Sequence, residues 1–177
     1  MTVVDSLRRL SVLAHQEMVE AVEGVSEGQS WAVLPNNGPD YLHSDGSIHA
    51  IALHVATCKV MYASAGFKGT EIRWRDLAEK VDGFEPSWQR AVEYLHEAQR
   101  YWLESWSDLE DDGLQREIQH PQGAMLPAIE VISLMIRHDS YHAGQIAVLR
   151  YGVAETDLHP PSAAEDIRVH CADSVSW

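Results

Sequence analysis

The sequence predicts an all-α fold, a four-helix bundle followed by a short irregular C-terminal tail. The chain contains four segments of about 20 residues in which apolar side chains recur at steps of three and four, the period of a helix. It shows little of the alternation of apolar and polar residues that is typical of half-buried strands. Glycine- and proline-containing stretches separate the segments, so four helices can fold back on one another as a bundle.

The first two helices are expected over 3–22 and from about 44–47 to 65. Asp5 and Ser6 suit the first turn of the first helix, and Ser47 or Asp45 can cap the second. The expected core stripe of the first helix is Leu7, Leu10, Ala14, Met18 and Ala21. That of the second is Ile51, His54, Cys58, Met61 and Ala65. The glycines after residue 23 and the sequence PNNGPD (35–40) predict a loop between them.

The third helix is expected over 87–109 and the fourth from the HPQG stretch to Tyr151. The tryptophan-rich face of the third is expected to form core or a dimer seam. The segment 75–80 predicts a short helical turn, and the acidic segment 108–113 a solvated loop. Pro127 is tolerated in a first helical turn. The fourth stripe is Val131, Met135, His138, His142, Ile146 and Leu149. Residues 1–152 then form the bundle, and residues 153–177 a tail that packs on or near it.

Composition and charge exclude several classes of function. The formal net charge is -14 and no cluster of Lys and Arg offsets it, which disfavours nucleic acid and anionic membranes as partners. No apolar run reaches about 18 residues, and the start MTVVDSLRRL lacks the pattern of a signal peptide. The two cysteines, Cys58 and Cys171, are expected to be free thiols. A cytoplasmic protein is the expectation.

Three histidines fall within predicted apolar stripes and are candidate metal ligands. His138 and His142 are four residues apart, so both imidazoles lie on one face of the fourth helix and can bind one ion. His54 lies within the stripe of the second helix and can supply a third nitrogen from across the core. Three histidine ligands leave a position open, as catalytic sites do. The simpler alternative is that these histidines are hydrogen-bonded core residues.

The sequence H-D-x-x-H around Asp139 also resembles the H-E-x-x-H of zinc peptidases, but a peptidase is disfavoured. An aspartate is one methylene shorter than the glutamate that serves as base. The metzincin continuation fails as well, because Gly144 comes too early and Val148 stands where the third ligand belongs. A peptidase would also leave His54 without a role.

At these residues the chain resembles the DinB/YfiT-like metalloenzyme family. The family pattern is a histidine in the second helix and H-x-x-x-H in the fourth, commonly followed by G-Q-[IL]. Here these are His54 in ALHVATCKVMY and His138 and His142 in HDSYHAGQIAVLRYG. The resemblance covers residues 1–152. His49 is an alternative to His54, but it lies about 140° away around the helix and near its start.

The resemblance implies a four-helix bundle, often a homodimer, that binds one divalent ion through His54, His138 and His142. Zinc is the default metal, and nickel, iron and copper also suit imidazole ligands. Family members include bacillithiol- or mycothiol-dependent transferases and maleylpyruvate isomerases. The leading hypothesis is therefore a metal-dependent transferase that joins a low-molecular-weight thiol to a small electrophile. The alternatives are a hydrolase using metal-bound hydroxide and a non-catalytic metal- or ligand-binding stress-response protein, so enzymatic activity itself stays open.

Four neighbouring residues also have candidate roles. Cys58 either approaches the metal or fills space as a small apolar residue. Asp139 either orients a ligand imidazole or acts as base, or else is a solvated acid. Gln145 either supports a ligand or packs between helices. Gly144 is expected to allow a neighbouring backbone or the site to come close.

Overall fold

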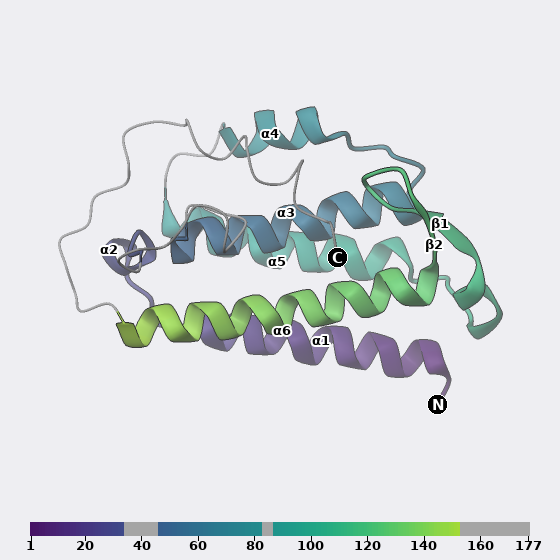
Figure 1. Ribbon diagram of the computed structural model, residues 1–177, viewed down its shortest axis with the longest axis horizontal. Helices are drawn as coiled ribbons and strands as arrows, with labels where there is room; N and C mark the ends of the chain where they lie inside the picture. The colour runs from purple at the N-terminus through teal and green to yellow at the C-terminus, as the bar shows by residue number, and fades with distance from the viewer. Residues whose placement is uncertain (34–45, 83–86, 153–177) are drawn as a thin grey trace.

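The computed structural model describes residues 1–33, 46–82 and 87–152, and these form a bundle of four long helices (Figure 1). The all-α prediction is confirmed. The long helices are α1 (Val3–Val22), α3 (Ile48–Phe67), α5 (Trp88–Ser105) and α6 (Ala128–Gly152). The shorter elements are α2 (Glu27–Ser30), α4 (Trp74–Asp82), the 3₁₀ helix η1 (Asp111–Gln115), β1 (Glu117–Gln119) and β2 (Met125–Pro127). Cys171, Asp45, Pro86, the sequence 35–40 and the tail 153–177 lie outside the described residues.

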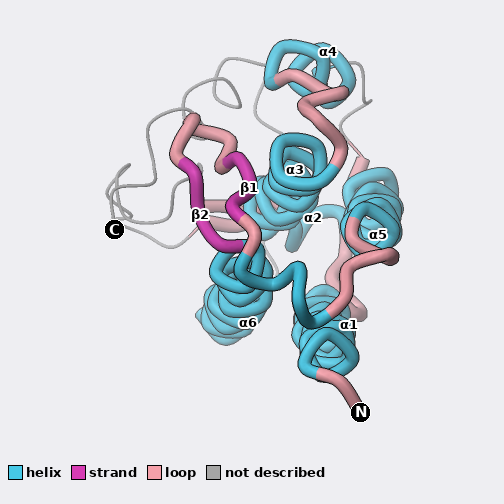
Figure 2. Tube along the Cα trace, turned by 90° about the vertical axis from the view of Figure 1, so that its right-hand side faces the viewer, coloured by secondary structure: helices cyan, strands magenta, loops and turns pink. Residues whose placement is uncertain are grey.

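The four long helices pack as two pairs, α1 with α6 and α3 with α5, and α3 also contacts α6. Seen end-on in Figure 2, they occupy the corners of the bundle, and α4 lies outside α3. Helices α1 and α6 run in the same direction: Ser140 donates a hydrogen bond to Glu17, and further along both helices Arg150 donates to the carbonyl of Ala21. Among the described helices, the first therefore packs against the last.

The predicted cap Ser47 and the predicted first-turn residue Asp5 are confirmed, whereas the cap of α1, Thr2, was not predicted. Thr2 and Asp5 form a capping box on α1, and Ser47 caps α3. The carboxylate of Asp111 also accepts hydrogen bonds from the backbone N–H groups of Val3 and Val4, at 3.0 and 2.9 Å. Asp111 is exposed, as predicted for 108–113, but 111–115 form η1 and not a loop, and the charge of Asp111 satisfies free N–H groups at the start of α1.

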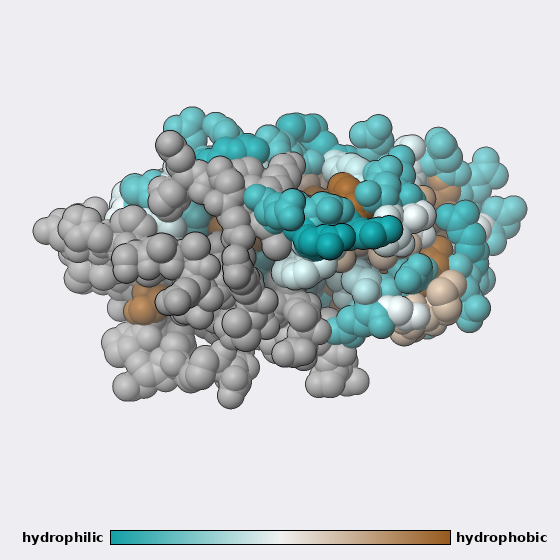
Figure 3. Space-filling model, turned by 90° about the horizontal axis from the view of Figure 1, so that it is seen from above, coloured by the Kyte–Doolittle hydropathy of each residue, from teal (hydrophilic) through white to brown (hydrophobic). Residues whose placement is uncertain are grey.

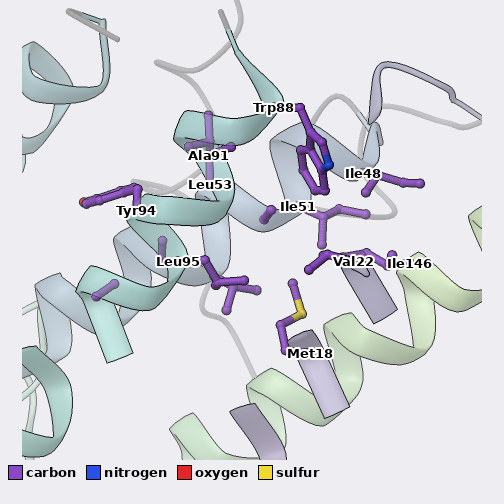
Figure 4. Close-up of a cluster of buried hydrophobic side chains, with 14 of the residues drawn as sticks. Met18, Val22, Ile48, Ile51, Leu53, Trp88, Ala91, Tyr94, Leu95 and Ile146 are labelled. Carbon is purple, nitrogen blue, oxygen red and sulfur yellow. The ribbon is translucent and has the colours of Figure 1, made fainter. Parts of the chain in front are cut away.

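Two apolar clusters fill the bundle. The first, shown in Figure 4, contains Met18, Ile51, Leu95 and Ile146, one residue from each long helix. The second lies toward the other end and is rich in aromatic residues: Tyr62, Trp102 and Trp106 belong to it. The tryptophan-rich face of α5 is therefore core, as expected. Leu10 is exposed, so the buried stripe of α1 differs from the predicted one: Val4, Leu7, Ser11, Ala14, His15, Met18 and Val22.

A polar layer, defined here as His15, Lys59, His96 and Asp139, crosses the bundle between the two clusters and takes one residue from each long helix. Lys59 and Asp139 are each 1% exposed and form an ion pair at 2.6 Å. The ammonium of Lys59 also lies 3.2 Å from Nδ1 of His15, whose Nε2 lies 3.4 Å from Nδ1 of His96. Each buried polar group of the layer thus has a polar partner, as burial requires.

Helix α3 is the only helix, among those described, that is long and apolar enough to cross a membrane, although the sequence shows no uninterrupted apolar run of that length. Within its apolar window 67% is buried inside the bundle. A helix that is apolar on all sides is expected at the centre of a fold, and the contacts of α3 with both α5 and α6 place it there. Seen from above, the described surface is mainly hydrophilic (Figure 3).

The β-hairpin and α2 were not predicted, because strands of three residues and a four-residue helix carry little periodic signal. Pro127 ends β2 instead of lying in the first turn of α6, which begins at Ala128. The hairpin is fixed to α3 by His120, whose Nε2 lies 2.8 Å from the hydroxyl of Tyr62, both side chains being buried. This contact holds the connection before α6 against the core.

Candidate metal centre

One face of α3 is less buried than the rest, and it carries the candidate ligand. Between Ile48 and Ala65 the half-buried positions are Ala50, His54, Cys58 and Met61, and all others are buried. These four are spaced by four, four and three residues, so they share one side of the helix. The predicted core stripe is therefore wrong for His54, Cys58 and Met61, which lie on the least buried side of α3.

The structure brings His54, His138 and His142 together. One ring nitrogen from each lies within 4.8 Å of the others, and among the described residues this is the one group of histidine, cysteine and acidic side chains that can hold a metal ion. The ring centroids lie 5.1 Å apart for His54 and His138, 4.9 Å for His54 and His142, and 4.4 Å for His138 and His142. His142 is buried, whereas His54 and His138 are half-buried.

The spacing of the nitrogens fits a shared ion. Nε2 of His54 lies 3.1 Å from Nε2 of His138. Two imidazole nitrogens bound to one zinc ion at 2.0–2.1 Å, with ordinary bond angles, are separated by about 2.8–3.4 Å. This pair therefore has the separation that a shared ion requires, and the ligand nitrogen of the third imidazole lies within 4.8 Å of it. Their half-buried side leaves a route from solvent to the triad.

Gln145 contacts the buried member of the triad. Its Oε1 lies 2.6 Å from Nδ1 of His142, and its Nε2 donates to the hydroxyl of Tyr141 at 3.0 Å. The ring of Tyr141 meets that of His142 edge-on, with centroids 5.1 Å apart. Of the two interpretations of Gln145, the structure supports contact with a ligand.

The carboxylate of Asp139 pairs with Lys59 and not with a triad imidazole, so the predicted roles as partner of a ligand histidine and as solvated acid are wrong. It is buried against Lys59, and its Oδ1 has no hydrogen-bond partner within the described part of the chain. Burial raises the pKa of Asp139 to about 6, although Lys59 opposes this, and burial lowers the pKa of Lys59. Asp139 is thus neither solvated nor available as the base that a peptidase of the H-E-x-x-H type requires.

The remaining candidates lie beside the triad or away from it. Cys58 is half-buried and its Sγ lies 3.7 Å from Nε2 of His54, but it does not join the three-nitrogen group. His49 stacks on Trp31 with ring centroids 3.9 Å apart, so the choice of His54 over His49 stands. A Cβ on Gly144 would meet no described atom within 4 Å. Among the described residues, no neighbouring backbone or side chain therefore packs closely on this glycine, contrary to the prediction.

The helical fold and its three-histidine group define the class of protein: a helical bundle with a site able to hold a metal ion. The sequence profile of the DinB superfamily matches residues 12–146, more than half of the chain and including all three histidines. The chain belongs to the DinB superfamily, and the resemblance found from the sequence is confirmed. A comparison with curated proteins finds no match.

Proposed function

We propose that this protein is a metal-dependent transferase that joins a low-molecular-weight thiol to a small electrophilic substrate. The observation that carries the proposal is the convergence of three imidazoles on one half-buried side of α3, with two of their nitrogens 3.1 Å apart. His54, His138 and His142 would hold one divalent ion, zinc by default, with nickel, iron and copper as alternatives. A bound ion supplies Lewis acidity at the open side of the triad.

The charges of the residues in and near the triad support this chemistry. Three neutral imidazole donors add no negative charge, so the site keeps its full attraction for an anionic sulfur. Lys59 forms an ion pair with the buried carboxylate of Asp139, so this negative charge is compensated within the core. In the transfer, the thiol loses its proton to solvent, its sulfur bonds to the electrophilic carbon, and the leaving group departs with the bonding electrons.

The test is conjugation by metal-loaded protein of an aryl halide with a panel of small thiols. We expect conjugation that depends on the metal and is lost in His138→Ala. A parallel panel of esters, amides and phosphate esters, assayed without thiol, tests hydrolysis at the same site. Metal-dependent hydrolysis without conjugation would replace the transferase by a hydrolase. Inactivity of the loaded protein in both panels would leave a metal-binding protein and overturn the proposal.

We also propose a homodimer as the assembled form. Exposed apolar side chains on the two adjacent helices α1 and α6 support it: Val3, Leu10, Leu13, Tyr141 and Val148. Sedimentation equilibrium of the purified protein tests the proposal. A monomer at all concentrations measured would contradict it.

A further inference from the structure

The hydrogen bonds of Gln145 determine which nitrogen of His142 can bind an ion. A neutral imidazole carries one proton, and the nitrogen that holds it has no lone pair to offer a metal. Oε1 of Gln145 is an acceptor only, and it lies 2.6 Å from Nδ1 of His142. This contact therefore requires a proton on Nδ1 and leaves Nε2 as the donor atom.

We propose that Gln145 is a positioning residue that holds His142 in the Nδ1–H tautomer and thereby sets the metal affinity of the triad. The inference rests on the metal site proposed above. A ligand histidine is ordinarily fixed by an acceptor at its second nitrogen, and loss of such an acceptor costs about 10–100-fold in metal affinity. Gln145 is the residue that offers this acceptor to His142, from the next turn of the same helix.

Tyr141 contacts the other end of the amide. In this orientation the hydroxyl of Tyr141 accepts from Nε2 of Gln145 at 3.0 Å, and the amide oxygen faces Nδ1 of His142. A reversed amide would donate to Nδ1 of His142, place the imidazole proton on Nε2 and block the site. The orientation of one side-chain amide thus decides whether the triad offers two donor nitrogens or three.

The tautomer can be measured without metal. In ¹⁵N–¹H spectra of the metal-free protein at alkaline pH, where imidazoles are neutral, wild-type His142 should show a protonated Nδ1. Gln145→Glu keeps an oxygen acceptor and should keep this tautomer. Gln145→Met, of similar length but without an acceptor, should shift the proton toward Nε2. A protonated Nε2 in the wild type would overturn the inference.

Zinc affinity supplies the second measurement, by competition with a coloured chelator. Gln145→Met should bind zinc about 10–100-fold more weakly than wild type, and Gln145→Glu should recover most of the loss. Gln89→Met is the matched control, because Gln89 is exposed on α5 and donates to Glu93 one turn away, apart from the triad. Equal zinc affinity of Gln145→Met and wild type would overturn the role proposed for Gln145 but not the metal site. Failure of the wild type to bind zinc would instead overturn the metal site.

Discussion

Two groups of polar side chains lie between the same apolar clusters, and they differ in how they are satisfied. In the polar layer, buried charges are paired: Lys59 and Asp139 are 2.6 Å apart, with His15 on the same ammonium. In the triad, three imidazoles face one another, and two of them are half-buried. The neighbours Asp139 and His138 on α6 belong to opposite groups, because successive residues of a helix point about 100° apart.

The difference separates histidines that hydrogen-bond within the core from histidines that are candidate metal ligands. His15 accepts from a buried lysine and contacts His96, and His120 contacts Tyr62, so each completes a hydrogen-bond network in or near the core. The triad histidines instead offer nitrogens to a common point near the open face of α3. A histidine on an apolar stripe is therefore a ligand candidate only when others converge on it and the site is reachable.

The largest expected effect is the loss of one triad member. His138→Ala should abolish measurable zinc binding, because removal of a ligand must cost more than the roughly 10–100-fold loss caused by removing a ligand's partner. Titration calorimetry of the folded protein measures this. His96→Ala, which removes a half-buried histidine of the polar layer, should leave zinc affinity unchanged. A similar loss in both variants would remove the distinction between the two groups.

Substitutions in the polar layer should change the free energy of unfolding. Lys59→Met leaves Asp139 buried without its partner and should lower the free energy of unfolding by about 3–5 kcal/mol. Urea denaturation measures it. The double variant Lys59→Met/Asp139→Leu removes both charges and should recover most of that loss. A single variant as stable as wild type would show that the ion pair is not needed for the core.

The pH dependence of stability should report on His15. Burial and the adjacent Lys59 lower the folded-state pKa of His15 to about 3. As the pH falls below 6.5, His15 is therefore protonated in the unfolded chain but stays neutral in the folded protein. Stability from this group is complete above pH 6.5 and is lost as pH falls toward 3, at about 1.4 kcal/mol per pH unit. His15→Asn, which does not titrate, should show a correspondingly shallower slope in metal-free urea denaturation at pH values between these limits. Equal slopes would contradict the buried neutral state.

The smallest expected effect concerns two helical glycines. Gly144→Ala should raise the free energy of unfolding by up to about 1 kcal/mol, since the added Cβ meets no described atom and alanine favours the helix. Gly66→Ala should not, because its Cβ would lie 2.9 Å from Cδ1 of Ile118. Thermal denaturation of both variants tests the pair. A destabilised Gly144→Ala would show that another surface packs on this glycine.

The sequence predicted those features that depend on local period and spacing. The bounds of α1 and the capping roles of Asp5 and Ser47 follow from residues within one or two turns of each other. The i, i+4 spacing of His138 and His142 likewise predicted a shared face. The roles of Asp111 and Asp139 were missed, because each depends on a partner about 80–110 residues away that no local pattern specifies.

The pairing of α1 with α6 has a consequence for synthesis of the chain. Residues of α1 can form their long-range hydrogen bonds only after much later residues have been synthesised. The backbone N–H groups of Val3 and Val4 donate to Asp111, and the side chain of Glu17 accepts from Ser140. His54 likewise contacts a residue that is synthesised later, His138. A nascent chain that stops before residue 128 contains one of the three triad imidazoles, so the three-histidine group can form only after α6 has been translated.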